Sequence, residues 1–232
     1  PTFHGGLSMV CIALAYVYWA AVLIPRSWDV LAFSHVVLAV VSVPMWWFFW
    51  MSWKADPGTI HPSPEQVIKG ICAEEIVIED VYVSAMSPKY PRAKYSRFFD
   101  CYVARFDHDC PWISNVVGAG NHHYFVGFCF MCSLCLSIWC FITMYMIGIT
   151  GHAYTDKKCG ERLGKGCPSR GDVVVFGLAH EKMAMVLLII YLLYALFTWC
   201  MTFHQLRQIA QNVTTNEMIN WHRYPGWQKE DG

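Results

Sequence analysis

The run Met183–Phe203, with the sequence MAMVLLIIYLLYALFTWCMTF, decides the fold class of this chain. It contains no charged side chain, and about twenty consecutive apolar residues suffice to cross the hydrocarbon core of a bilayer. Three further runs have the same character, namely Leu7–Pro25, Leu31–Met51 and Tyr124–Ile149. We therefore predict an all-α membrane protein with four transmembrane helices, of which the first two form a hairpin.

The composition agrees with this fold class and excludes one kind of partner. Of the 232 residues, 56% are hydrophobic and 15% are charged, whereas charged side chains make up about one quarter of an ordinary soluble domain. The formal net charge is zero, so the excess of basic residues that is typical of nucleic-acid-binding proteins is absent. We expect the lipid bilayer to be a partner of this chain and nucleic acid not to be one.

The apolar runs divide the chain into six regions. They are helices 1 and 2 at residues 1–51, a polar domain at 52–123, helix 3 at 124–149, a loop at 150–181, helix 4 at 182–206 and a tail at 207–232. Four crossings place the termini and the polar domain on one side of the membrane. Lys and Arg favour the cytosolic side, but the polar domain carries seven and the shorter loop five. The chemistry of the polar domain, rather than this count, places it in the cytosol.

Two cysteines fall in the loop on the opposite side. Cys159 and Cys167 would there face an oxidising lumen, where disulfides form and persist. A disulfide that closes a small loop and two free thiols are both compatible with the sequence.

The polar domain holds a short reactive motif, Asp-His-Asp-Cys-Pro-Trp at 107–112. A cysteine thiol is mostly protonated at neutral pH and becomes a strong nucleophile when a base lies within hydrogen-bond reach. His108 can be that base for Cys110 if the chain turns between them, and Asp107 can orient the imidazole. The alternative is a polar loop beside the membrane in which a cysteine and a histidine meet by chance.

Basic side chains precede this motif. Such side chains can bind the phosphates of a nucleotide-like carrier, or they can form a surface that faces anionic lipid headgroups. The candidates are Lys89, Arg92, Lys94, Arg97 and Arg105.

Four motifs in this order resemble the DHHC family of protein S-acyltransferases. They are Asp56-Pro57-Gly58, the stretch 107–112, a segment with Asn115, Gly118 and Asn121-His122-His123-Tyr124-Phe125, and Thr214-Thr215-Asn216-Glu217. Each motif alone is weak, but together they cover most of the chain and are specific. The stretches 106–125 and 214–224 are most similar to the ankyrin-repeat (huntingtin-interacting) subgroup. This similarity implies an ankyrin-repeat domain outside the present chain.

The resemblance implies a reaction and a role for each matching residue. Cys110 would take a long-chain acyl group from a co-substrate such as palmitoyl-CoA and pass it to a cysteine of a cytosolic or membrane protein. His108 would act as the base, Asp107 would orient it, and Thr215 would tie the tail to Asp107. The basic candidates would meet the CoA phosphates. The structural motif residues would be Asp56, Pro57, Gly58, Asn121, Thr214, Thr215 and Glu217. The family also implies a Golgi, endomembrane or plasma-membrane location, with the active site facing the cytosol.

The chain departs from the family at its metal ligands. The family pattern supplies two structural zinc ions with three cysteines and one histidine each, and its eight ligand positions fall on residues that are not such ligands. They are Tyr82, Ala85, Tyr95, Ser96, Phe99, Tyr102, Asp109 and Val116. A structural zinc ion needs about four ligands. We predict no zinc and no permanently bound cofactor, and we expect the aromatic side chains to form a small hydrophobic core instead.

Asp109 introduces a carboxylate between the expected base and nucleophile. It can disfavour the Cys110 thiolate, or it can stabilise a charged His108 and strengthen the base. The alternative function, which the loss of the zinc ligands supports best, is a catalytically weak or inactive membrane scaffold or subunit. A transporter is disfavoured because the four runs contain no acidic residue, and intramembrane charges normally mark ion paths. The retention of Asp107, His108 and Cys110 favours the enzyme.

Overall fold

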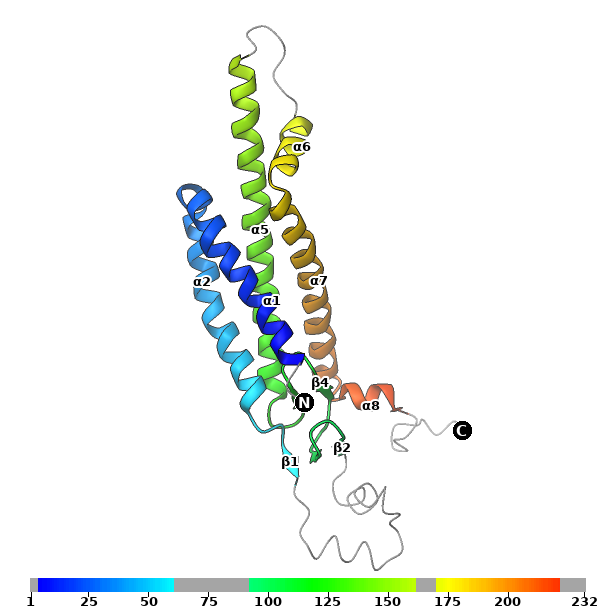
Figure 1. Ribbon diagram of the computed structural model, residues 1–232. Coiled ribbons are helices and arrows are strands. Elements are labelled where there is room, and N and C mark those ends of the chain that lie inside the picture. The colour runs from blue at the N-terminus through cyan, green and yellow to red at the C-terminus, as the bar shows by residue number, and fades with distance from the viewer. Residues whose placement is uncertain (1–3, 61–91, 162–169, 222–232) are drawn as a thin grey trace, which may run out of the picture. The chain divides into compact units, whose positions relative to one another are not determined.

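The structure is a computed structural model, and it describes residues 4–60, 92–161 and 170–221. Most of the described residues are helical (Figure 1). The helices are α1 (His4–Tyr18), the π-helical turn η1 (Trp19–Leu23), α2 (Ile24–Lys54), α5 (His122–Glu161), α6 (Arg170–His180), α7 (Lys182–Ala210) and α8 (Thr215–Ile219). Within this part of the chain, three helical segments are long and apolar enough to cross a membrane, namely Val10–Lys54, His122–Tyr154 and Lys182–Ala210.

The chain divides into two compact units. The helical unit comprises Cys11–Met45 and Cys129–Thr202. The site unit comprises Pro1–Val10, Trp46–Phe128 and Phe203–Gly232.

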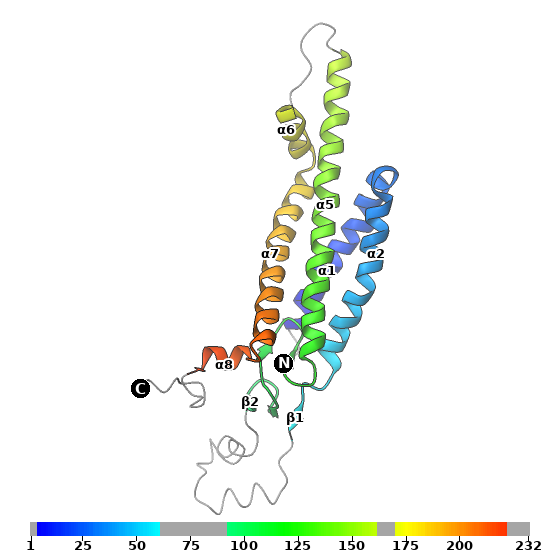
Figure 2. The ribbon, with the colours of Figure 1, turned by 180° about the vertical axis from the view of Figure 1, so that it is seen from behind.

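The segment Val10–Lys54 folds back on itself. Tyr16 donates a hydrogen bond to Ser42, and Trp19 Nε1 donates to His35 Nδ1 at 2.9 Å. A straight α-helix would hold residues 16 and 42 about 39 Å apart. The backbone leaves helical geometry at Leu31 (φ −117°, ψ 21°). The two arms therefore run side by side, as Figure 2 shows from behind.

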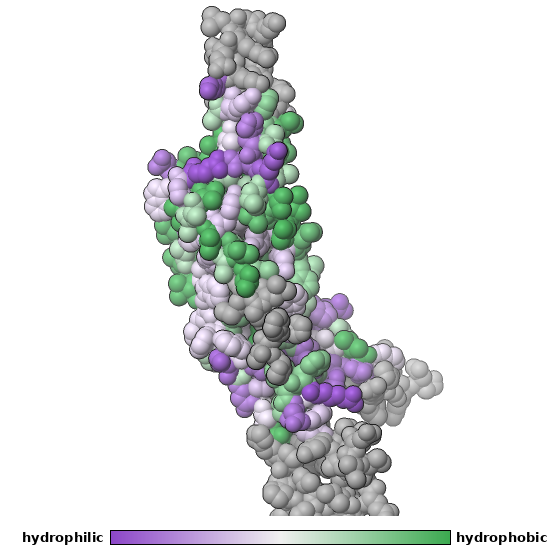
Figure 3. All heavy atoms as spheres, viewed as in Figure 1, coloured by the Kyte–Doolittle hydropathy of each residue, from purple (hydrophilic) through white to green (hydrophobic). Residues whose placement is uncertain are grey.

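Trp139 of α5 lies at the centre of the helical unit. Its side chain is buried, its Nε1 donates to Ala15 O of α1 at 3.1 Å, and its ring meets the ring of Tyr191 of α7 at 4.7 Å between centroids. Outward-facing positions on α2 and α7 are apolar, such as Val40, Val43 and Leu193. Figure 3 shows hydrophobic side chains on the outer face of the helices. An exposed apolar surface of this kind suits contact with lipid.

The predicted loop at 150–181 is largely helical. The α5 helix continues to Glu161, and α6 occupies Arg170–His180. Gly151 and Gly177 lie so close to the backbones of Val173 and Ile147 that a Cβ atom would collide there, which brings α5 and α6 into direct contact. The placement of this region as a loop outside the membrane stays a prediction, and the helices were not foreseen because the end of an apolar run does not end a helix.

The site unit contains two small antiparallel sheets, which the all-α expectation omitted. The first has the strand order β1-β3-β2, with β1 at Thr59–Ile60, β2 at Lys94–Ser96 and β3 at Cys101–Val103. The second is the hairpin of β4 (His108–Cys110) and β5 (Asn115–Val117). Strands of two or three residues leave no alternating pattern in a sequence, and their pairing depends on tertiary contacts.

The β4–β5 hairpin is anchored beneath the end of α2. Asn115 Nδ2 donates to the carbonyl oxygens of Ser52, Trp53 and Ala55 at 3.0–3.1 Å, which satisfies acceptors that a helix end leaves open. Asn121 Nδ2 donates to Val116 O at 2.7 Å. The position of the hairpin is thereby fixed relative to the end of the helix.

The Asp-Pro-Gly motif forms the turn that follows α2. Asp56 Oδ1 accepts hydrogen bonds from the backbone of Gly58 and Thr59, and Gly58 has a φ of 95°, which favours glycine. Pro57 O accepts from the backbone of Gly120 at 3.0 Å. A Cβ atom on Gly120 would collide with this turn, so the motif packs backbone to backbone against the segment that follows β5.

Candidate active site

Strand β4 determines which side chains of the reactive motif can meet. Successive side chains of a strand point to opposite faces, so His108 and Cys110 share one face. His108 is hydrogen-bonded to the Cys110 side chain, and Cys110 is buried. The expected turn between the two residues is therefore a strand, which produces the contact by alternation.

Asp109 points to the other face of β4. Its carboxylate accepts a hydrogen bond from the Ser96 hydroxyl. Because the strand directs this carboxylate away from Cys110, it does not act directly on the thiol.

Asp107 completes the constellation from the residue before β4. It is buried, and its Oδ2 lies 2.7 Å from His108 Nδ1. The backbone N–H of Thr215 donates to Oδ1 at 2.6 Å, and the Thr215 hydroxyl donates to Oδ2 at 2.9 Å. Gln205 Nε2 donates to Oδ2 at 3.2 Å. The carboxylate is held from α7 and α8 as well as from its own segment.

The electrostatics of this group suit an activated thiol. Burial raises the pKa of Asp107, but hydrogen bonds from His108 and Thr215 outweigh it and hold the pKa at about 2. Burial lowers the pKa of His108, but its hydrogen bonds to Asp107 and Cys110 outweigh that effect and raise the pKa to about 9. An imidazole that keeps its proton at neutral pH beside a cysteine stabilises a thiolate. The arrangement can therefore perform nucleophilic chemistry at Cys110.

The tail contributes Thr215 through a well-capped short helix. Thr214 caps the N-terminus of α8 and forms a capping box with Glu217. Glu217 is buried and pairs with Arg92, whose Nη2 donates to Glu217 Oε2 at 2.8 Å. Burial raises the pKa of Glu217, but the Arg92 guanidinium and the capping contacts outweigh it and lower the pKa.

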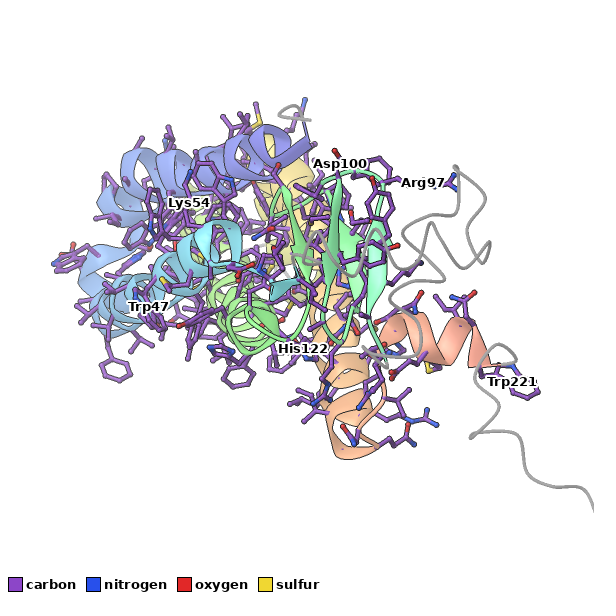
Figure 4. All side chains as sticks on the ribbon, turned by 90° about the horizontal axis from the view of Figure 1, so that it is seen from below. Trp47, Lys54, Arg97, Asp100, His122 and Trp221 are labelled. Atoms are coloured by element: carbon purple, nitrogen blue, oxygen red, sulfur yellow. The ribbon has the colours of Figure 1, made fainter. Side chains whose placement is uncertain are left out.

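Three of the five basic candidates contact the tail. Arg92 binds Glu217 and also donates to Asn212 O at 2.8 Å, Lys94 donates to Asn216 Oδ1 at 2.8 Å, and Arg105 donates to Asn212 Oδ1 at 2.8 Å. Arg97 is exposed in the turn between β2 and β3 (Figure 4). Lys89 lies outside the described residues. A sequence pattern shows the charges of such residues but not their partners.

The positions that carry zinc ligands in the family pattern fall into two groups in space. Ser96 and Asp109 are hydrogen-bonded, Asp109 pairs with Val116 across the hairpin, and Phe99 packs against the buried cluster that contains Val116. In the second group, Tyr95 and Tyr102 pair across β2 and β3 with ring centroids 5.2 Å apart. Tyr82 and Ala85 lie outside the described residues.

The first group does not fit a zinc ion. One hydroxyl and one carboxylate face each other, and the remaining two positions are hydrocarbon, whereas structural zinc takes four nitrogen or sulfur ligands in most sites. Among residues 4–60, 92–161 and 170–221, no cluster of three or more His, Cys, Asp or Glu side chains has the geometry for a metal ion.

Metal analysis of the purified protein tests this prediction. We expect well below one zinc ion per chain and an unchanged melting temperature after EDTA treatment, because hydrogen bonds and apolar contacts occupy the ligand positions that the structure describes. About two zinc ions per chain would contradict it.

The structure does not test the predicted lumenal disulfide. The pair Cys159 and Cys167 lies outside the residues whose side chains the structure describes, so the disulfide stays a prediction. No sequence signal points to Gln205 and His122 as site residues, because Gln205 follows an apolar run and His122 belongs to a motif with no evident chemistry. Figure 4 shows His122 at the start of α5, beside the strands.

Comparison with known proteins supports the pattern found in the site. A family model described as DHHC palmitoyltransferase matches residues 78–222. The chain is 32% identical over 219 residues to Palmitoyltransferase Hip14 of Drosophila melanogaster, which covers 88% of this chain and 31% of that protein. It is 37% identical over 119 residues to Palmitoyltransferase ZDHHC17 of Homo sapiens, with 46% and 19% covered. It is 26% identical over 227 residues to Palmitoyltransferase AKR1 of Kluyveromyces lactis, with 94% and 30% covered. This chain thus spans about a third or less of the length of these relatives.

Proposed function

Because this chain belongs to the DHHC palmitoyltransferase family, we propose that it is the membrane-embedded catalytic part of a protein S-acyltransferase. The observation that carries this function is the contact sequence from Thr215 through Asp107 and His108 to Cys110. These residues come from two segments more than a hundred positions apart, and burial keeps water from the nucleophile. A scaffold protein would not require such an arrangement.

The reaction has two balanced steps. In the first, the Cys110 thiolate attacks the carbonyl carbon of palmitoyl-CoA, the bond from that carbon to the CoA sulfur breaks, and the departing CoA sulfur takes the proton of His108. In the second, His108 takes the proton of an acceptor cysteine while that sulfur attacks the Cys110 thioester. Cys110 then leaves as a thiolate beside the protonated His108, and the site is restored.

The membrane topology proposed here has four spans. The fold-back contacts of Tyr16 and Trp19 support two crossings within Val10–Lys54, and α5 and α7 supply the other two. The site unit would face the cytosol, and the membrane would be that of the Golgi, another endomembrane compartment or the plasma membrane. The regions of the chain would have the boundaries expected from the sequence, except that the α5 helix extends beyond its span. The resemblance to the ankyrin-repeat subgroup is our ground for proposing an ankyrin-repeat domain that recruits protein substrates, and the relatives are long enough to hold one.

Arg97 is the proposed contact for the CoA phosphates, together with Lys89. It is exposed, whereas Arg92, Lys94 and Arg105 already bind groups of the tail. We propose that these three primarily hold the tail against the strands, and that any contact with phosphate is secondary to this role.

An acyl-transfer assay tests the function. The protein in lipid nanodiscs, incubated with palmitoyl-CoA and a cysteine-containing membrane-anchored peptide, is expected to produce palmitoylated peptide, and Cys110→Ala is expected to produce none above the uncatalysed rate. Cys200→Ala is the matched control, because Cys200 is an exposed cysteine of α7 outside the site. Equal transfer by wild type and Cys110→Ala would contradict the function.

A further inference from the structure

The side chain of Gln205 links the active site to a second histidine. Gln205 is fully buried on α7, and both ends of its amide have partners. Nε2 lies 3.2 Å from Asp107 Oδ2, and Oε1 lies 2.6 Å from His122 Nε2. The unbroken contact sequence is therefore His122, Gln205, Asp107, His108 and Cys110.

The chemistry of the amide fixes the direction of these hydrogen bonds. An ionised carboxylate only accepts hydrogen bonds, so the amide NH₂ of Gln205 must face Asp107 and the amide oxygen must face His122. His122 therefore carries a proton on Nε2 and donates it. The donors of His122 and Gln205 therefore both point along this series of contacts toward the negatively charged Asp107 carboxylate.

The Asp107 carboxylate is surrounded by side chains from several helices and one strand. His108 from β4 contacts the carboxylate, and His122 from α5 acts on it electrostatically. The uncharged Gln205 from α7 and Thr215 from α8 supply the further hydrogen bonds. Gln205 Nε2 also lies 3.4 Å from the Thr215 hydroxyl, so Gln205 contacts Thr215 as well as the carboxylate that both residues hold.

We propose that Gln205 and His122 are positioning residues of the acyl-transfer reaction, which hold the Asp107 carboxylate in the orientation that contacts His108 Nδ1. This role deepens the function proposed above and rests on the same site. Neither residue touches the reacting atoms. Their effect on the thiol passes through Asp107 and His108.

The test measures Cys110 directly, without acyl-CoA. The rate of alkylation of Cys110 by iodoacetamide is followed from pH 5 to pH 10 by peptide mass spectrometry on the full chain in nanodiscs. Gln205→Met keeps the length of the side chain and removes its hydrogen bonds to Asp107, His122 and Thr215. We expect about tenfold slower alkylation at pH 7 and a half-maximal rate about one pH unit higher, the effect of one lost hydrogen bond to a charged group.

Matched controls come from neighbouring positions. Gln211→Met changes an exposed glutamine that follows the end of α7, and His123→Phe changes the exposed histidine beside His122. His122→Phe is expected to follow Gln205→Met with a smaller shift, and His122→Gln, which can still donate to the amide oxygen, is expected to restore the wild-type profile. In acylation assays, Gln205→Met should lower kcat and leave the KM for palmitoyl-CoA unchanged.

Profiles of Gln205→Met and His122→Phe that match their controls would overturn the proposal. If Gln205→Met does not fold, His122→Phe against His123→Phe decides the question. Absence of acyl transfer by the wild type together with a clear Gln205 effect on alkylation would remove the proposed function and leave the positioning role intact.

Discussion

Replacement of Asp107 by asparagine is expected to slow acylation of Cys110 by a factor on the order of 10³–10⁴. The amide preserves the shape of the side chain, but its NH₂ group can face His108 Nδ1 and stabilise the tautomer in which Nε2 carries the only proton. Nε2 then cannot take the proton of Cys110. The loss of the carboxylate also removes the interaction that raises the pKa of His108 to about 9. Quenched-flow measurement with palmitoyl-CoA gives the rate.

The control for this variant is Asp29→Asn, which changes an exposed aspartate of the helical hairpin. A rate of Asp107→Asn within threefold of the wild-type rate would contradict the assigned role.

The same pair of groups predicts how stability varies with pH. Because the folded pKa of His108 is raised, its contribution is fully present below its unfolded pKa of about 6.5. It is lost as the pH rises through about 9. Asp107, whose folded pKa is lowered, contributes above its unfolded pKa of about 3.9, and this contribution is lost as the pH falls through about 2. Melting temperatures of the wild type should therefore decline between pH 6.5 and pH 9, and those of Asp107→Asn should decline less.

The second large effect is expected from Arg92→Met. This substitution leaves Glu217 as an unpaired charge whose side chain is only 2% exposed. Removal of one partner of a buried ion pair typically costs about 3–5 kcal/mol. Because the Arg92 side chain is 25% exposed, we expect the lower end, about 3 kcal/mol. Denaturation of the protein in detergent measures this loss, and acylation should fall with it because α8 carries Thr215.

Two further variants separate the ion pair from a general effect of charge removal. Arg97→Met removes an exposed arginine of the same unit and should leave the melting temperature unchanged. Arg92→Met combined with Glu217→Met should recover part of the lost stability, because no unpaired buried charge remains. Equal melting temperatures for Arg92→Met and Arg97→Met would contradict the assigned ion pair.

The parts of the fold that were predictable are those that depend on local sequence. Apolar runs such as Met183–Phe203 mark membrane-spanning helices because each residue there meets the same solvent. The family motifs identified Asp107, His108 and Cys110, and the structure brings these three together. The resemblance also indicated the contact between Thr215 and Asp107, which joins residues 108 positions apart.

The remaining features depend on partners distant in the sequence. The strand at His108–Cys110 exists because β5 pairs with it and Asn115 anchors β5 to α2. From the sequence alone, Arg92 and Arg105 are candidate phosphate ligands. The structure shows that they contact groups of the tail. Gln205 has no neighbour in sequence that reveals its link from Asp107 to His122.

Intact mass spectrometry of the purified protein after incubation with palmitoyl-CoA tests the central claim most directly. We expect a single acyl adduct on the wild type that hydroxylamine removes, and no adduct on Cys110→Ser, which keeps the fold but lacks the thiol. Wild-type protein that is folded in lipid and acquires no adduct, or Cys110→Ser that acquires the same adduct, would contradict the account.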